Sequence, residues 1–155
     1  MAEERAAVLR GGCQCGAVRY ALYAEPVSAG ICHCRMCQKA LGNLFVAAAG
    51  VPEEAFAWTR GRPAVFASSS AAERGFCREC GTPLSFRYLG RKEISITIGS
   101  LDEPAQVKPR EQIGIESRVP WLEAALALPG QTTEEGAPAD VLAGLKNLQH
   151  PDREA

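Results

Sequence analysis

The chain has 155 residues, of which 46% are hydrophobic and 23% charged, and its formal net charge is -1. This length suits one domain with an ordinary core, and the near-neutral charge without a long basic cluster argues against nucleic-acid or anionic-lipid partners. No segment approaches the roughly 20 apolar residues of a membrane helix. The amino terminus has acidic residues where a signal peptide carries basic ones, so we expect a cytoplasmic protein.

Short strands separated by turns are predicted for the first half of the chain. Apolar side chains alternate with other residues at 18–22, which predicts a half-buried strand. The continuous apolar run at 44–48 predicts a buried strand. Segments 56–58 and 64–67 flank a turn that contains glycine and proline, and together they predict a hairpin.

Strand signals continue in the second half. Alternation at 84–88 and 93–98 predicts the clearest strands, and 112–116 predicts another. Residues 120–126 predict a short helix with proline in its first turn. Valine and leucine at helical spacing predict a last helix over 139–149.

The segment at 130–138 has the composition of a linker, rich in glycine, threonine and glutamate. We therefore expect one domain at 1–130, followed at 131–155 by a linker and a helical appendage.

Seven cysteines dominate the pattern of the chain. They form three clusters: Cys13 and Cys15; Cys32, Cys34 and Cys37; Cys77 and Cys80. Cysteines one or two residues apart rarely form a relaxed disulfide with each other, but they can present two thiolates to one ion. An odd number cannot be fully paired, and a reducing compartment keeps thiols free. The clusters therefore predict zinc binding.

Seven thiolates divide naturally into four plus three. Four close a tetrahedral zinc shell, whereas three leave a position for water or substrate, which is the usual difference between structural and catalytic zinc. Residue spacing alone does not decide which clusters join. Two zinc ions per chain would also stabilise a small, glycine-rich, mostly β domain.

Five strings in this order resemble the glutathione-dependent formaldehyde-activating enzyme family. They are GCQCGAVRY at 12–20, CHCRMC at 32–37, RGFCRECG at 74–81, GSLD at 99–102 and ESRVPW at 116–121. The order and spacing of all three cysteine clusters match, and the resemblance covers roughly residues 11–129. It implies a mainly β, Mss4-like fold, a folded, tent-like sheet system stapled by zinc. Composition and periodicity alone support only a small zinc-bearing β domain.

The resemblance also implies how the cysteines divide. The structural zinc would be held by Cys13, Cys15, Cys77 and Cys80. The second, catalytic zinc would be held by Cys32, Cys34 and Cys37, with one position open. The division is physically sensible, because joining two distant pairs closes a long loop of chain.

An open position on a three-thiolate zinc favours a soft ligand such as a thiolate. In the family reaction, glutathione adds to formaldehyde to give S-hydroxymethylglutathione, and the reverse step cleaves a carbon–sulfur bond. The resemblance therefore implies a carbon–sulfur lyase whose small-molecule partner is glutathione, a related thiol or its adduct.

Two positions depart from the family pattern. Gln112 stands where many members carry a histidine, and Leu126 and Ala127 stand where an acidic pair often precedes Leu-Pro. Neither position is a proposed zinc ligand, so the departures concern the substrate rather than the metal.

Other polar and aromatic residues near the clusters have plainer interpretations. For His33, between two proposed ligands, we favour a supporting or surface role over coordination, and His150 is an ordinary residue of the last helix. We expect Trp121 in the core and Asp102 in a turn.

Three basic residues flank the clusters: Arg35, Lys39 and Arg78. They could offset thiolate charge or meet the carboxylates of glutathione, although solvated surface charge is the more ordinary reading. Two other functions fit the cysteines: a non-enzymatic zinc module for a protein partner, as in the namesake of the fold, and a cysteine-based redox or metal-handling protein. Fold alone does not choose among them.

Overall fold

A small antiparallel sheet holds the amino-terminal part of the chain. The computed structural model describes residues 5–153. The sheet has the order β1-β2-β5, and its strands are β1 (Leu9–Gly12), β2 (Arg19–Leu22) and β5 (Phe56–Arg60). The ring of Tyr20 on β2 stacks on Phe56 and meets Trp58 edge to face. All four residues of β2 are buried, so the strand predicted there is confirmed but its half-buried character is wrong.

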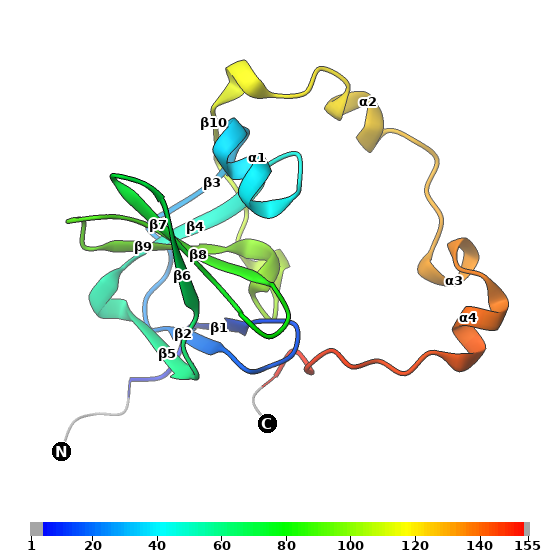
Figure 1. The fold of residues 1–155 in the computed structure, drawn as a ribbon, viewed down its shortest axis with the longest axis horizontal. Coiled ribbons are helices and arrows are strands. Elements are labelled where there is room, and N and C mark those ends of the chain that lie inside the picture. The colour runs from blue at the N-terminus through cyan, green and yellow to red at the C-terminus, as the bar shows by residue number, and fades with distance from the viewer. Residues whose placement is uncertain (1–4, 154–155) are drawn as a thin grey trace.

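A second sheet of seven strands forms most of the body, in the order β10-β3-β4-β9-β8-β7-β6 (Figure 1). Its strands are β3 (Ser28–Cys32), β4 (Val46–Pro52), β6 (Ala64–Ser69), β7 (Ala72–Phe76), β8 (Pro83–Tyr88), β9 (Glu93–Thr97) and β10 (Glu111–Ile113). Neighbours are antiparallel except β10 and β3, which run parallel. The mainly β architecture that we expected is confirmed.

Two details of the predicted strands differ from the structure. The strand expected at 44–48 lies two residues later and runs to Pro52. The hairpin expected from 56–58 and 64–67 is wrong, because β5 pairs with β2 in the small sheet while β6 pairs with β7 in the large one. The intervening turn therefore carries the chain from one sheet to the other instead of folding it back on itself.

The hydrophobic core draws on both sheets. Tyr20 and Leu22 come from the small sheet, and Val51, Leu84 and Ile96 from the large one, all essentially inaccessible to solvent. Burial of side chains of this size is worth about 1.5–3 kcal/mol each. This shared core fixes the two sheets relative to each other. It thereby also fixes the cysteines, which lie at or just beyond the ends of strands.

Helices are few and short. Among the α-helices of residues 5–153, only α1 (Arg35–Leu41) lies between strands, whereas α2 (Leu122–Leu126), α3 (Thr133–Gly136) and α4 (Ala139–Gly144) follow β10. Residues 118–146, here called the arm, arc away from the body (Figure 1). None of the helices in the described part of the chain has the length and apolar character needed to cross a membrane.

The last helix is shorter than its sequence pattern predicts. It ends at Gly144 rather than near Gln149, and Leu145 and Leu148 are exposed. Isolated helices of this length are marginal without an apolar surface to pack on. The chain then returns to the body, where the His150 amide donates to the carbonyl of Gln14 at 2.7 Å, so His150 is not a helical residue.

Candidate metal centres

Two matching turns present four cysteines to one another. Cys13 and Cys15 follow β1, and Cys77 and Cys80 lie between β7 and β8. In the first turn the Gly16 amide donates to the Cys13 carbonyl at 3.0 Å, and in the second the Gly81 amide donates to the Cys77 carbonyl at 2.8 Å. Both glycines have positive φ angles, 78° and 79°, which other residues adopt at a cost.

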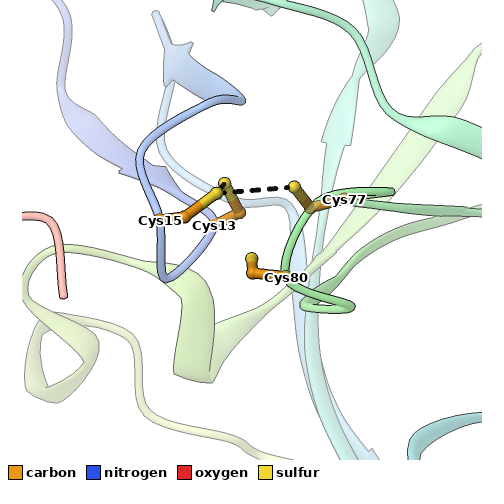
Figure 2. Close-up of side chains that lie close together, drawn as sticks. All are labelled: Cys13, Cys15, Cys77 and Cys80. Atoms are coloured by element: carbon orange, nitrogen blue, oxygen red, sulfur yellow. Dashed lines mark hydrogen bonds between the residues drawn. The ribbon is translucent and has the colours of Figure 1, made fainter. Parts of the chain in front are cut away.

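Sulfur atoms of this first cluster converge on a common centre (Figure 2). The Sγ atoms of Cys13 and Cys15 are 3.6 Å apart, and those of Cys15 and Cys77 are 3.8 Å apart. All four Sγ atoms, that of Cys80 included, lie within 4.8 Å of one another, and none forms a disulfide. Four thiolates on one tetrahedral zinc, with bonds of about 2.3 Å, would lie about 3.8 Å apart. The donor set therefore fits a zinc ion.

Hydrogen bonds from the protein also suit thiolates in this cluster. The Val18 amide donates to Cys13 Sγ at 3.2 Å. The Thr82 hydroxyl accepts from the Gln14 amide at 3.0 Å, which leaves its own proton for Cys80 Sγ at 3.2 Å. Because β1 belongs to the small sheet and β7 and β8 to the large one, an ion held here would cross-link the two sheets.

The thiols of the first cluster differ widely in acidity. The Ala17 amide lowers the pKa of Cys15, but desolvation and the neighbouring thiols outweigh it and raise that pKa to about 12. Burial raises the pKa of Cys80, yet the Thr82 hydroxyl and nearby amides outweigh burial and lower that pKa to about 6. Crowded thiols resist joint ionisation, and a bound cation relieves this repulsion.

The second cluster is local in sequence. Cys32 ends β3, Cys34 caps the amino end of α1, and the amide of Cys37 donates to Cys34 Sγ at 3.4 Å. The three Sγ atoms lie within 4.8 Å of one another. Burial and the neighbouring thiols raise the pKa of Cys32 to about 12, whereas amide hydrogen bonds, mainly from Cys37, outweigh burial and lower the pKa of Cys34.

No fourth histidine, cysteine or carboxylate joins this second group within residues 5–153. His33 is buried, with 1% of its surface exposed, and its Nε2 lies 2.9 Å from the amide oxygen of Gln112 on β10. Because that oxygen can only accept, Nε2 carries the proton. His33 thus supports the loop by binding β10, and the surface position considered from sequence is wrong.

Two further contacts hold the cysteine loop against β10 and the following turn. The side-chain amide of Gln38 donates to the His33 carbonyl at 2.7 Å and to the Ser117 carbonyl at 2.9 Å. Gly114 lies so close to the loop that a Cβ there would stand 2.6 Å from the amide nitrogen of Cys34. The sequence did not identify Gln38 and Gln112 as supports of the site. Gln38 binds Ser117 and Gln112 binds His33, and the two residues of each pair lie 79 positions apart in the sequence.

Arg74 is the main site residue that sequence reasoning did not identify. Its Nη2 donates to Cys37 Sγ at 3.4 Å, and its guanidinium carbon lies 4.9 Å from the centre of the Phe86 ring. The only signal was its place in the family-like string before Cys77. That string points to the first cluster, whereas the side chain reaches the second.

The remaining residues that the sequence suggested for the site or the core lie in different environments. The Arg35 guanidinium donates to the side chain of Gln38, and Lys39 and Arg78 are exposed as expected for surface charges. Trp121 is 53% exposed, so its expected core position is wrong, because the arm that carries it leaves the body. Asp102 does more than shape a turn, since both of its oxygens accept from Arg19.

Comparisons with known proteins identify relatives of the chain in sequence and in fold. A curated protein of Schizosaccharomyces pombe, named an uncharacterised lyase, is 34% identical over 90 residues, which cover 53% of this chain and 59% of that protein. The chain thus spans less than two thirds of that relative. A crystal structure of a Rhodobacter sphaeroides protein is similar in fold, with a TM-score of 0.54 at 22% identity, covering 66% of this chain and 98% of the other. The family model described as glutathione-dependent formaldehyde-activating enzyme matches residues 8–117, and the chain therefore belongs to that family.

Proposed function

We propose that the protein is a zinc-dependent carbon–sulfur lyase of the glutathione-dependent formaldehyde-activating type. The observation that carries this proposal is the second cluster, where three thiols converge without a fourth ligand from the described residues. Such a donor set leaves room for an exogenous thiol on the metal. Family membership and the lyase name of the yeast relative support the same class of reaction.

The two clusters take different roles in this proposal. The first, formed by Cys13, Cys15, Cys77 and Cys80, holds a structural zinc that joins the sheets. The second, formed by Cys32, Cys34 and Cys37, holds the catalytic zinc, so that each chain binds two ions. A cytoplasmic location suits seven unpaired cysteines, because that compartment keeps thiols reduced. We assign both clusters to a domain at 1–130 and regard 131–155 as its appendage.

In the reaction, the sulfur of glutathione or a related thiol attacks the carbonyl carbon of formaldehyde. The carbon–sulfur bond forms, the carbonyl oxygen takes up a proton, and the reverse step cleaves the same bond. A zinc ion at the second cluster would lower the pKa of the incoming thiol from about 8.5 and so supply its thiolate at neutral pH. The chain itself fixes the cysteine loop through Gln38 and the His33–Gln112 contact, so the three thiols that would hold the ion keep one arrangement.

Metal content measured with and without glutathione tests this proposal most directly. We expect two zinc ions per chain, and we expect glutathione to change the visible spectrum of protein whose second cluster holds cobalt. Cys37→Ser should abolish that spectral change. If no simple thiol alters the cobalt spectrum, the lyase proposal is wrong and a protein-binding zinc module becomes the better explanation. Rapid oxidation of the cysteines in native, metal-loaded protein would favour the redox alternative instead.

A further inference from the structure

The surface beside the second cluster carries a guanidinium among aromatic rings. Phe66 on β6, Arg74 on β7 and Phe86 on β8 are direct cross-strand neighbours, so their side chains share one face of the sheet. Tyr88 follows two residues after Phe86 on the same face, and the two rings meet edge to face at 4.9 Å. Phe66 is 62% exposed and Tyr88 is 58% exposed, so this face is open to solvent.

Arg74 lacks the acidic partner that a half-buried arginine ordinarily has. Its guanidinium contacts Cys37 Sγ and the Phe86 ring, and no carboxylate within residues 5–153 pairs with it. Its Nε is buried and has no hydrogen-bond acceptor among those residues. By contrast, the neighbouring Arg87 on β8 pairs with both Glu53 and Glu73. Because a buried Nε is closed to an incoming molecule, the donors left for one are those of the two Nη atoms, for which the described chain supplies no acceptor besides Cys37 Sγ.

The position of Arg74 restricts what that acceptor can be. A thiol bound at the second cluster would lie close to Cys37, and Arg74 Nη2 already lies 3.4 Å from Cys37 Sγ. The Phe86 ring, whose centre lies 4.9 Å from the guanidinium carbon, helps to hold this group, and the two oxygens of a carboxylate match its pair of Nη donors. Arg35, the other arginine near the cluster, is turned to Gln38.

We propose that Arg74 binds a carboxylate of the thiol substrate and makes the second cluster selective for thiols that carry an acidic group. The inference rests on the proposed function, because it requires a thiol at that cluster. The aromatic face formed by Phe66, Phe86 and Tyr88 would then contact the apolar stem of the same molecule. Neutral thiols would bind through sulfur alone.

Two simple thiols of similar size test the proposal: 3-mercaptopropionate, which is an anion, and 2-mercaptoethanol, which is neutral. Their dissociation constants would be measured by titrating the cobalt-loaded protein and its Arg74→Gln and Arg91→Gln variants. Comparing variants cancels the intrinsic difference in thiol acidity. Arg91 is exposed in the turn between β8 and β9, and its side chain bonds neither to the cysteines nor to the aromatic rings, so Arg91→Gln makes the same charge change without removing a contact of the site.

We expect Arg74→Gln to reduce the preference for 3-mercaptopropionate by about tenfold, and Arg91→Gln to leave it unchanged. If Arg74→Gln weakened the binding of both thiols equally, the proposal would be overturned. Arg74 would then serve only to offset the negative charge of the cysteines. If neither thiol changes the spectrum of the wild-type protein, the proposed function itself fails.

A second measurement needs no variant and so does not depend on the folding of Arg74→Gln. Wild-type protein should bind glutathione about tenfold more tightly than its diethyl ester, in which both carboxylates are neutral. Equal affinity for the two compounds would overturn the proposal.

Discussion

Arg19 and Asp102 form a buried ion pair that joins β2 to the segment after β9. Arg19 Nη1 donates to Asp102 Oδ1 at 2.7 Å and Nη2 donates to Oδ2 at 2.5 Å, with side chains only 3% and 11% exposed. Two parallel, charge-assisted hydrogen bonds give this contact a fixed geometry. The pair explains how an arginine can stand in a strand whose other residues are apolar and buried.

We expect Asp102→Asn to lower the free energy of unfolding by about 3 kcal/mol. The substitution removes the negative charge that Asp102 supplies to a buried guanidinium, which is far more costly than losing a surface contact. Urea unfolding of the metal-loaded protein would measure the difference. Glu103→Gln, which makes the same charge change at the exposed neighbour, should have an effect below about 0.5 kcal/mol. Similar values for both variants would contradict this account of the pair.

Tyr20 predicts a loss of stability in alkaline solution. Burial raises its pKa well above the usual 10, and the hydroxyl bonds to Ser100 at 2.7 Å. The folded state therefore holds the phenol proton more tightly than the unfolded state does. This contribution to stability is complete below pH 10 and is lost as pH rises above it toward the folded pKa.

Comparison with Tyr20→Phe isolates that effect. The variant should lose about 1 kcal/mol at pH 7 with the Ser100 hydrogen bond, and its stability should fall less steeply than that of the wild type above pH 10. Urea unfolding from pH 7 to pH 11 gives both numbers. Parallel curves for the two proteins would show that Tyr20 is not responsible.

Among the elements, the two cysteine clusters differ in what they connect. The first cluster joins the turn after β1 to the turn between β7 and β8, whereas the second lies within one loop and the start of α1. A metal in the first should therefore hold the sheets together, and a metal in the second should mainly form a site.

Two matched substitutions test this difference. Cys77→Ser should lower the melting temperature by about 10 °C or more, or prevent folding, because binding free energy there is folding free energy. Cys37→Ser should leave a folded protein with near-normal circular dichroism but without the response to thiols. Thermal unfolding and far-UV circular dichroism of the two variants test this difference. Equal losses of stability in both variants would refute the division into a structural and a catalytic cluster.

Strands were predictable from sequence where alternation was long and uninterrupted, as in β8 and β9. The pairing of β5 with β2 was not predictable, since a short turn between two apolar segments usually indicates a hairpin. The complete burial of β2 was not predictable either, because Asp102, which pairs with Arg19, lies 83 residues further along the chain. Local patterns identify strands, but their partners depend on distant residues.

At the scale of the whole molecule, the arm is the part least supported by packing. Five large apolar side chains of the arm are more than half exposed: Trp121, Leu126, Leu128, Val141 and Leu145. Such a segment opens at little cost in free energy. The body, in contrast, is held by ten strands and a continuous core.

Limited proteolysis should therefore cut the arm first. With trypsin we expect early cleavage after Arg118 and Lys146, both exposed, while Arg74 and Arg87 in the sheet stay intact. Mass spectrometry of the early fragments identifies the sites. Cleavage within β7 or β8 at a comparable rate would contradict the contrast between body and arm.

Sequence reasoning predicted the site better than its surroundings. The cysteine clusters were recognisable from spacing because residues that can share one ion often recur at short intervals, and the structure brings together the same four and three sulfur atoms that the resemblance groups. Arg74 meets Cys37, 37 residues earlier in the sequence, and the tail at His150 meets Gln14 near the other end of the chain. Contacts of this kind form only when folding brings distant segments together, so no local pattern in the sequence predicts them.

The unequal spans of the clusters also set an order of assembly. The second cluster lies within six consecutive residues, whereas the first must bring together cysteines 62 residues apart. Closing a short loop costs less entropy than closing a long one. During synthesis, therefore, the three-cysteine loop can capture a metal long before Cys77 and Cys80 emerge. On the proposed assignment, the ion that joins the two sheets would therefore be bound after the other one during synthesis.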